Sequence, residues 1–258
     1  MARRELAVPE NVPGDLFVDE TCIECDTCRE LAPEVFGSLE SGQSFVQEQP
    51  ANDASWRRAL HAVVSCPTAS IGTERSAKEA ARDLPVHLEG PVYRCGYSSE
   101  ASYGAQSYFL RRDGGNILVD SPRFAAPLVR RIADSGGVRR MFLTHRDDAV
   151  IDAEVLLDGD GELGPGLRVI HLPGHTRGSC ALLVDERYLF TGDHLWAWEG
   201  RLEMGRSVSW YSWTEQKKSL RKLLDYRFEW VLPGHGRSLR LPADRMREEM
   251  ADLHGRLR

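Results

Sequence analysis

The chain has 258 residues, of which 41% are hydrophobic and 28% charged, with a net charge of −6. This is the balance of a soluble globular protein of one or two domains. No run approaches the roughly 18 apolar residues of a membrane span, and the first residues lack the apolar core of a signal peptide. We therefore expect a cytoplasmic protein without membrane contact, and the absence of a long basic run argues against nucleic acid as a partner.

Near the N-terminus, four cysteines stand in a pattern typical of iron–sulfur proteins: Cys22, Cys25, Cys28 and, thirty-eight residues later, Cys66. Cysteines at every third position lie on one tight turn of the backbone, so their sulfurs can converge on a single inorganic core. In two-cluster bacterial ferredoxins the run continues with a cysteine before a proline, but here Ala32 precedes Pro33. The pattern predicts one cluster held by the four cysteines.

Disulfide bonds and a zinc site are the competing roles for these cysteines. Disulfides are disfavoured because cytosolic thiols stay reduced. A four-cysteine zinc site is the stronger competitor, although such sites usually use two Cys-x2-Cys pairs instead of a triplet and a distant single residue. We therefore expect a [4Fe–4S] cluster, with a [3Fe–4S] cluster and zinc as the alternatives. Cys95 and Cys180 fall in apolar segments and are expected to be small buried residues.

The segments that flank the triplet, residues 17–20 and 31–36, resemble those of single-cluster ferredoxins. The resemblance covers about residues 10–75 and implies a small ferredoxin-like domain over residues 1–75. These residues carry thirteen acidic against six basic side chains. Such a surface can steer a basic redox partner towards the cluster, although an ordinary solvated surface accounts for the charge equally well.

Residues 76–90 are charged and contain Pro85 and Gly90, so we interpret them as a linker to a second domain, residues 91–258. In the first domain a strand is predicted at 43–47, and a helix begins after Asn52 and ends before Pro67. In the second domain strands are predicted at 92–97, 106–110, 116–120, 140–144, 167–170, 180–184, 188–191 and 229–232. Helices are predicted at 122–135, 214–224 and 242–256, and turns at 158–166. This order is typical of an α+β protein whose sheets are covered by helices.

Four strand ends of the second domain carry polar residues of metal-binding type. Each lies where a hydrophobic strand gives way to a loop, the place where a rigid scaffold often presents site residues. Glycines beside three of them permit sharp turns. The candidate residues are His145, Asp147, His175, Asp193 and His235.

Together these motifs resemble the metallo-β-lactamase superfamily over about residues 90–240. The resemblance implies a shortened αββα sandwich whose metal site is built from loops along one edge of the sheets. It implies that His145 and His175 bind the first metal, that Asp193 bridges, and that His235 binds a second metal. Asp147 stands where the family has a histidine and can bind through oxygen.

Two departures from the family pattern limit this site. Ala149 and Val150 replace the family's Asp-His pair, which leaves the second metal short of ligands, and only thirty residues separate His145 from His175. We therefore expect either one zinc or iron ion or a degenerate site.

Such an ion would lower the pKa of a bound water towards neutrality. The resemblance implies a hydrolase of the glyoxalase II type, acting on a thioester, or an oxidoreductase coupled to the cluster; the small-molecule substrate is not defined. The catalytic set would be His145, Asp147, His175 and Asp193. The alternative is an electron-transfer or redox-sensing module whose second domain is a non-catalytic scaffold for a partner.

Overall fold

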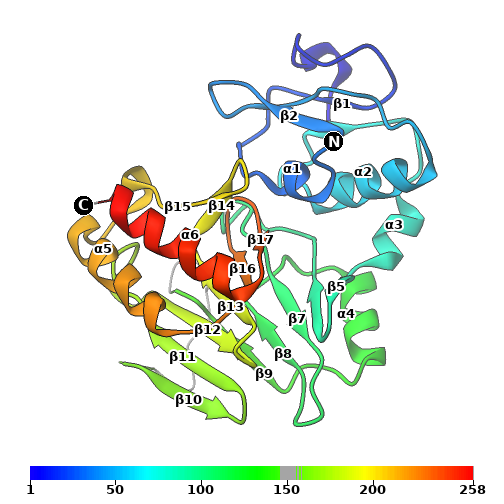
Figure 1. Ribbon diagram of the computed structural model, residues 1–258. Helices are drawn as coiled ribbons and strands as arrows, with labels where there is room; N and C mark the ends of the chain where they lie inside the picture. Colours follow the sequence, from blue (N-terminus) through cyan, green and yellow to red (C-terminus); the bar gives the residue numbers. More distant parts are fainter. Residues whose placement is uncertain (146–154, 156, 158, 258) are drawn as a thin grey trace. The chain divides into compact units, whose positions relative to one another are not determined.

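The computed structural model describes residues 1–145, 155, 157 and 159–257; its elements are labelled in Figure 1. Contacts divide the chain into two compact units, Met1–Met141 and Phe142–Arg258. Within the described ranges, no helix combines the length and the apolar character needed to cross a bilayer. The four cysteines belong to the first unit, and the described candidate metal ligands belong to the second.

The N-terminal half of the first unit is built from short paired strands and two helices. Strand β1 (Phe17–Val18) pairs antiparallel with β4 (Ile71–Gly72), and β2 (Phe36–Ser38) pairs with β3 (Ser44–Val46). A short 3₁₀ helix, η1 (Arg4–Leu6), precedes them, and helix α1 (Thr27–Leu31) carries Cys28. Their core is formed by buried side chains that include Leu16, Val18, Val35, Phe36, Val46, Ala59 and Ala62.

Helix α2 (Asp53–Ser65) delivers the fourth cysteine. It begins with a capping box, in which the Asn52 side chain accepts from the Ser55 amide at 2.9 Å and the Ser55 hydroxyl accepts from the Asn52 amide at 3.1 Å. These contacts satisfy two of the amides that a helix N-terminus leaves unpaired. The helix ends at Ser65, so Cys66 lies at its C-cap, as the sequence predicts.

Residues 78–89, predicted as part of a linker, instead form helix α3 (Lys78–Asp83) and strand β5 (Val86–Glu89). Strand β5 pairs antiparallel with β6 (Val92–Arg94). The prediction missed these elements because the segment is largely polar and is punctuated by Pro85 and Gly90. Only Ala80, Leu84 and the adjoining Pro85 are fully buried in it.

The first unit also contains most of a five-stranded sheet in the order β5-β6-β7-β8-β9. Its further strands are β7 (Tyr108–Leu110), β8 (Ile117–Val119) and β9 (Arg140–Phe142), whose last residue begins the second unit. Helix α4 (Ala126–Asp134) packs on it through Leu128 and Ile132. The same core includes Leu84, Cys95 and Phe109, with Val64 of α2 packed against it, so the cysteine-bearing segment and the sheet share apolar contacts.

The second unit is a six-stranded sheet in the order β10-β11-β12-β13-β16-β17. Only β13 and β16 are parallel neighbours; the other pairs are antiparallel. The strands are β10 (Gly161–Gly164), β11 (Leu167–His171), β12 (Cys180–Val184), β13 (Tyr188–Gly192), β16 (Trp230–Pro233) and β17 (Leu239–Arg240). Strand β10 corrects the prediction of turns at 158–166: although Gly161 and Gly164 bound it, its backbone pairs with β11.

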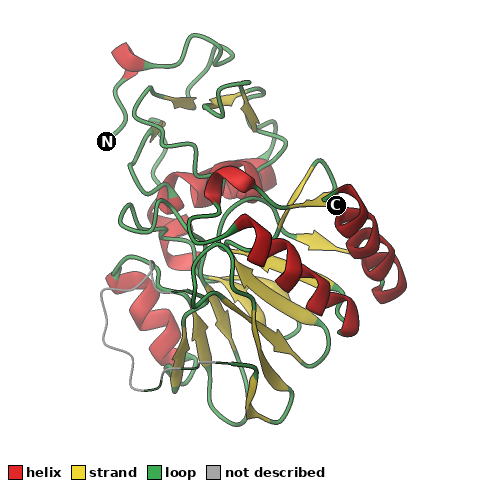
Figure 2. Ribbon diagram, turned by 90° about the vertical axis from the view of Figure 1, so that its left-hand side faces the viewer, coloured by secondary structure: helices red, strands yellow, loops and turns green. Residues whose placement is uncertain are grey.

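Two helices of the second unit cover one side of this sheet, α5 (Trp213–Lys222) and α6 (Ala243–Arg256) (Figures 1 and 2). Leu220 of α5 and Met246, Met250 and Leu253 of α6 join one core with Ile170 of β11 and Val231 of β16. The remaining elements are the hairpin β14 (Trp196–Trp198) with β15 (Arg201–Glu203), and the 3₁₀ helices η3 (Arg206–Val208) and η4 (Leu223–Asp225). Loops at the strand ends of the six-stranded sheet carry His175, Asp193 and His235, three of the predicted metal ligands.

Candidate metal centre

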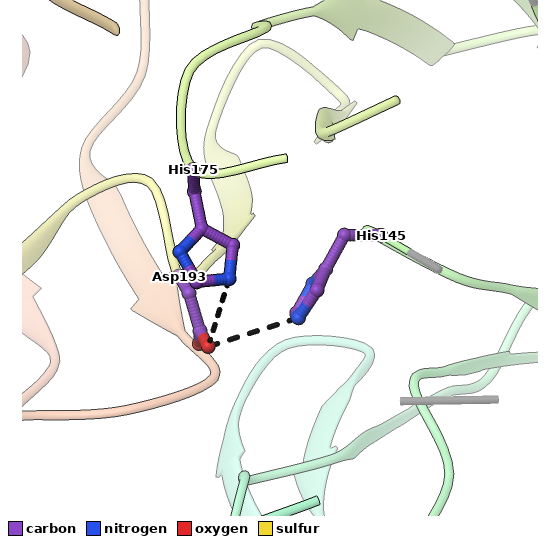
Figure 3. A group of neighbouring side chains, drawn as sticks. All are labelled: His145, His175 and Asp193. Carbon is purple, nitrogen blue, oxygen red and sulfur yellow. Dashed lines mark ion pairs between the residues drawn. The ribbon is translucent and has the colours of Figure 1, made fainter. Parts of the chain in front are cut away.

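Three of the sequence-predicted ligands come together in the second unit (Figure 3). His145 follows the end of β9, His175 lies in the loop between β11 and β12, and Asp193 directly follows β13. The two histidines are 4% and 1% exposed. One strand end of the five-stranded sheet and two strand ends of the six-stranded sheet therefore bring three residues that are far apart in sequence into one group.

The distances within this group fit a metal better than they fit hydrogen bonds. Asp193 Oδ2 lies 3.7 Å from His145 Nε2 and 3.6 Å from His175 Nε2, beyond the usual hydrogen-bond range. The three ligand atoms all lie within 4.8 Å of one another. Histidine nitrogens and a carboxylate oxygen are a donor set that zinc and iron accept.

The orientation of His175 is set by its other ring nitrogen. Nδ1 lies 2.5 Å from the carbonyl oxygen of Val208 in η3, and because a carbonyl only accepts, Nδ1 carries the proton. In the neutral imidazole, Nε2 then presents a lone pair. It is buried and has no hydrogen-bond partner among the described residues. A metal-binding histidine commonly donates its second N–H to a carbonyl in this way, so the buried Nε2 fits a metal ligand.

Asp193 is the charged centre of the group. Burial would raise the pKa of its carboxyl, but His235, and then His145 and His175, outweigh burial and lower the pKa to about 2. Its second oxygen, Oδ1, lies 2.7 Å from Nδ1 of His235 in the loop after β16. His235 thus contacts Oδ1 of Asp193, whereas Oδ2 faces His145 and His175.

Two glycines allow the loops to approach this closely. A Cβ on Gly192, whose φ is +51°, would lie 2.3 Å from Thr144 Oγ1 and 3.3 Å from His145 Nδ1. A Cβ on Gly234 would lie 2.6 Å from Asp193 Oδ1. Real Cβ atoms do not approach so near, so these glycines are required by packing at the site as well as by turn geometry.

Sequence reasoning missed one part of the site, the Val208 carbonyl. The Val208 carbonyl is a backbone group in an element that no motif marks. Trp210, of the same segment, places its ring 4.8 Å from that of His175, and its amide donates to the His175 carbonyl at 3.0 Å, yet its side chain is 68% exposed. His194, next to Asp193, is no part of the ligand group; burial, and then His175, lower its pKa to about 3, so it is neutral.

Asp147, predicted as a ligand and catalytic residue, lies outside the described residues, as do Ala149 and Val150. The described part of the site therefore consists of His145, His175, Asp193 and His235.

The four predicted cluster cysteines form a second group, in the first unit. Burial raises the pKa of the Cys25 thiol to about 11 and raises that of Cys28 further, and Cys22 and Cys66 each add to both shifts. Amides turn towards two of them: Glu24 N lies 3.4 Å from Cys22 Sγ, and Ser70 N lies 3.3 Å from Cys66 Sγ. Such donors stabilise cluster thiolates, so the group fits an iron–sulfur cluster.

Comparison with known proteins finds a family match in each of two segments of the chain. Residues 18–73 match the family described as the 4Fe-4S single cluster domain of Ferredoxin I, and residues 123–235 match the metallo-beta-lactamase superfamily. Over 79 residues the chain is 37% identical to the beta-lactamase-like protein 2 homolog of Drosophila melanogaster. That match covers 31% of this chain and 25% of the relative, so the chain spans about a quarter of the curated relative it matches.

Solved structures agree on the fold. The metallo-beta-lactamase from Pontibacter korlensis superposes with a TM-score of 0.52 at 15% identity, covering 67% of this chain and 97% of its own. The DIM-1 metallo-beta-lactamase exposed to ceftazidime gives 0.50 at 15% identity, covering 67% and 96%. At such identities the likeness shows the fold alone. The α+β class and both predicted resemblances are thereby confirmed: the chain carries a 4Fe–4S ferredoxin-type domain and a domain of the metallo-β-lactamase superfamily.

Proposed function

We propose that the metallo-β-lactamase-type domain is a metal-dependent hydrolase of thioesters or related acyl esters, in which His145, His175 and Asp193 hold one zinc or iron ion. The observation that carries this proposal is the buried Nε2 of His175, which has no hydrogen-bond partner among the described residues. The contact of Nδ1 with Val208 orients the ring, so that Nε2 faces the Asp193 carboxylate. A buried polar atom without a partner is costly. A metal ligand role removes that cost.

Each residue has a distinct task in this proposal. The bound ion supplies Lewis-acid activation of water and of an acyl carbonyl. Asp193, ionised at any physiological pH, provides the negative charge that retains the cation. His235 holds Oδ1 of Asp193, so that Oδ2 keeps facing the two histidines. Asp147, in the sequence two residues after His145, is proposed as a further ligand on the family resemblance alone.

Trp210 is proposed to contact the substrate, because its exposed ring lies beside a ligand histidine. Replacing Trp210 by alanine should raise KM about tenfold with little change in kcat, since the lost contact serves ground and transition state alike. Trp210→Phe should largely restore KM, because it keeps an aromatic surface. Steady-state kinetics on a thioester measure KM and kcat of these variants. A fall in kcat at unchanged KM would assign Trp210 to the chemical step instead of to substrate binding.

Metal removal tests the proposed function itself. The anaerobically purified chain should hydrolyse a member of a panel of thioesters and acyl esters, lose that activity on treatment with a chelator, and regain it with zinc or iron. The four cysteines are proposed to bind a cluster apart from this ion. The visible absorption spectrum of the cluster should therefore show whether the cluster survives the treatment. Hydrolysis that persists without the metal would refute the proposal.

A second candidate function is electron transfer through the cluster, and a specific observation favours it. Cys22, Cys25 and Cys66 are only half-buried, and the neighbouring Glu20 and Glu24 are exposed. A basic redox partner would be attracted to this surface. Electron transfer from the reduced cluster to a basic haem protein should then slow as salt rises, and stopped-flow rates independent of ionic strength would argue against such a partner.

A further inference from the structure

We propose that residues outside the ferredoxin-type segment complete the cluster site: Gly104 packs against the ligand Cys25, and Arg123 positions the ligand Cys66 and sets the reduction potential of the cluster. All of these residues belong to the first unit. The proposal is independent of hydrolysis in the second unit and depends on the four cysteines binding a cluster.

Gly104 lies directly against two residues of the cysteine motif. Its φ is +84°, and a Cβ built on it would lie 2.4 Å from Cys25 Cβ, 2.8 Å from Cys25 Sγ and 3.2 Å from Pro67 Cγ. Its carbonyl accepts from Thr27 Oγ1 at 3.1 Å, and that hydroxyl lies 3.5 Å from Cys25 Sγ. The backbone at Gly104 therefore forms one wall of the site, where no side chain fits.

Arg123 binds the end of the helix that carries Cys66. Its guanidinium donates to the carbonyls of Val64 at 2.6 Å and Cys66 at 3.3 Å, and to that of Ser98 at 2.8 Å. The first two are among the carbonyls that a helix C-terminus leaves unpaired, and a cation there also complements the helix dipole. Ser98 donates its own amide to Ser65 at 3.2 Å. The backbone of the fourth ligand is thus held from outside the cysteine motif.

The same contacts place a permanent positive charge next to Cys66. A reduced cluster carries one more negative charge than an oxidised one, so a nearby guanidinium stabilises the reduced state and raises the potential. Burial lowers the pKa of Arg123, and Cys66 opposes that shift; the group stays charged. Arg123 therefore acts on the cluster both by geometry and by charge.

Substitutions at Arg123 separate these two effects. In the full chain, Arg123→Gln should shift the midpoint potential of the cluster to more negative values and should speed cluster loss to a chelator by about tenfold, because charged hydrogen bonds are lost. Arg123→Lys keeps the charge without the fork of donors. It should keep the potential near that of the wild type while the cluster is still lost faster. Arg130→Gln, at an exposed arginine of α4, makes the same change in net charge and should alter neither.

Gly104 has a matched control in Gly137. Both have left-handed φ values, +84° and +71°, but a Cβ on Gly137 would meet nothing within 4 Å. Both alanine variants thus carry a similar backbone cost, and only Gly104→Ala presses on Cys25. Gly104→Ala should change the electron paramagnetic resonance spectrum of the reduced cluster or lower its occupancy, while Gly137→Ala should match the wild type.

The outcomes are decisive in both directions. If Arg123→Gln and Gly104→Ala keep the wild-type potential, spectrum and rate of cluster loss, the proposal is overturned. If Arg123→Gln fails to fold by circular dichroism, Arg123→Lys decides: faster cluster loss supports positioning by Arg123, and a wild-type rate refutes it. A change in Gly137→Ala equal to that in Gly104→Ala would show backbone strain alone and would refute the packing role of Gly104.

Discussion

Replacing His175 by alanine is expected to remove the metal of the second unit and to lower hydrolysis by more than about a hundredfold. The magnitude follows from metal sites in general, where loss of a mere supporting contact to a ligand costs about 10–100-fold. In the proposed centre His175 supplies a ligand atom directly, and its Nε2 has no hydrogen-bond partner among the described residues. Metal content by mass spectrometry and kcat/KM on a thioester measure the two effects.

Two further variants serve as controls for this result. His254→Ala, in helix α6, removes a histidine of the same unit that belongs to neither ligand group, and should retain metal and activity. Asp193→Asn keeps the shape of the side chain but removes the charge, so it should also release the metal. If His175→Ala kept full metal and activity, the ligand assignment would be wrong.

Replacing Cys66 by alanine should cost the chain its four-iron cluster, with conversion to a three-iron cluster or complete loss. Three cysteines then remain without a fourth. Burial raises the pKa of the Cys25 thiol to about 11, so without a cluster that thiol is neutral at pH 7. Cluster binding must therefore release protons, and loss of the cluster should become faster as the pH falls. Iron and sulfide analysis with paramagnetic resonance follows the change.

Cys95→Ala is the matched control for Cys66→Ala. Cys95 is fully buried in the core below the first sheet, and burial raises its pKa to about 12, as expected of a small apolar residue. Its replacement should leave the cluster content unchanged. One zinc per chain and no sulfide in the wild type would instead establish the four-cysteine zinc site.

The sequence was sufficient for features that depend on local spacing. The spacing of the cysteine triplet predicts that its three sulfurs lie close together, because three cysteines on one tight turn have few other arrangements. Asn52 and Ser55 predict the start of α2, and Cys66 therefore falls at its end. His175, Asp193 and His235 could be recognised because each follows a strongly apolar strand beside a glycine, and the sheet order β11-β12-β13-β16 brings those strand ends to one edge.

Features that depend on contacts between distant segments could not be predicted. Arg123 and Gly104 carry no motif, and only the folded first unit places them on Cys66 and Cys25. The Val208 carbonyl that orients His175 is a backbone group. Strands β5 and β10 are short and contain or adjoin glycine, so their pairing partners define them more than their composition does.

The most direct test of the metal centre is a count of metals in the anaerobically purified full chain, alongside His175→Ala. The wild type should hold about four iron and four sulfide for its single cluster and about one further zinc or iron ion held by the histidine–aspartate group. His175→Ala should lose that ion and keep the cluster. Cluster iron and sulfide alone in the wild type, with no further metal, would contradict the assignment of His145, His175 and Asp193 as a metal site.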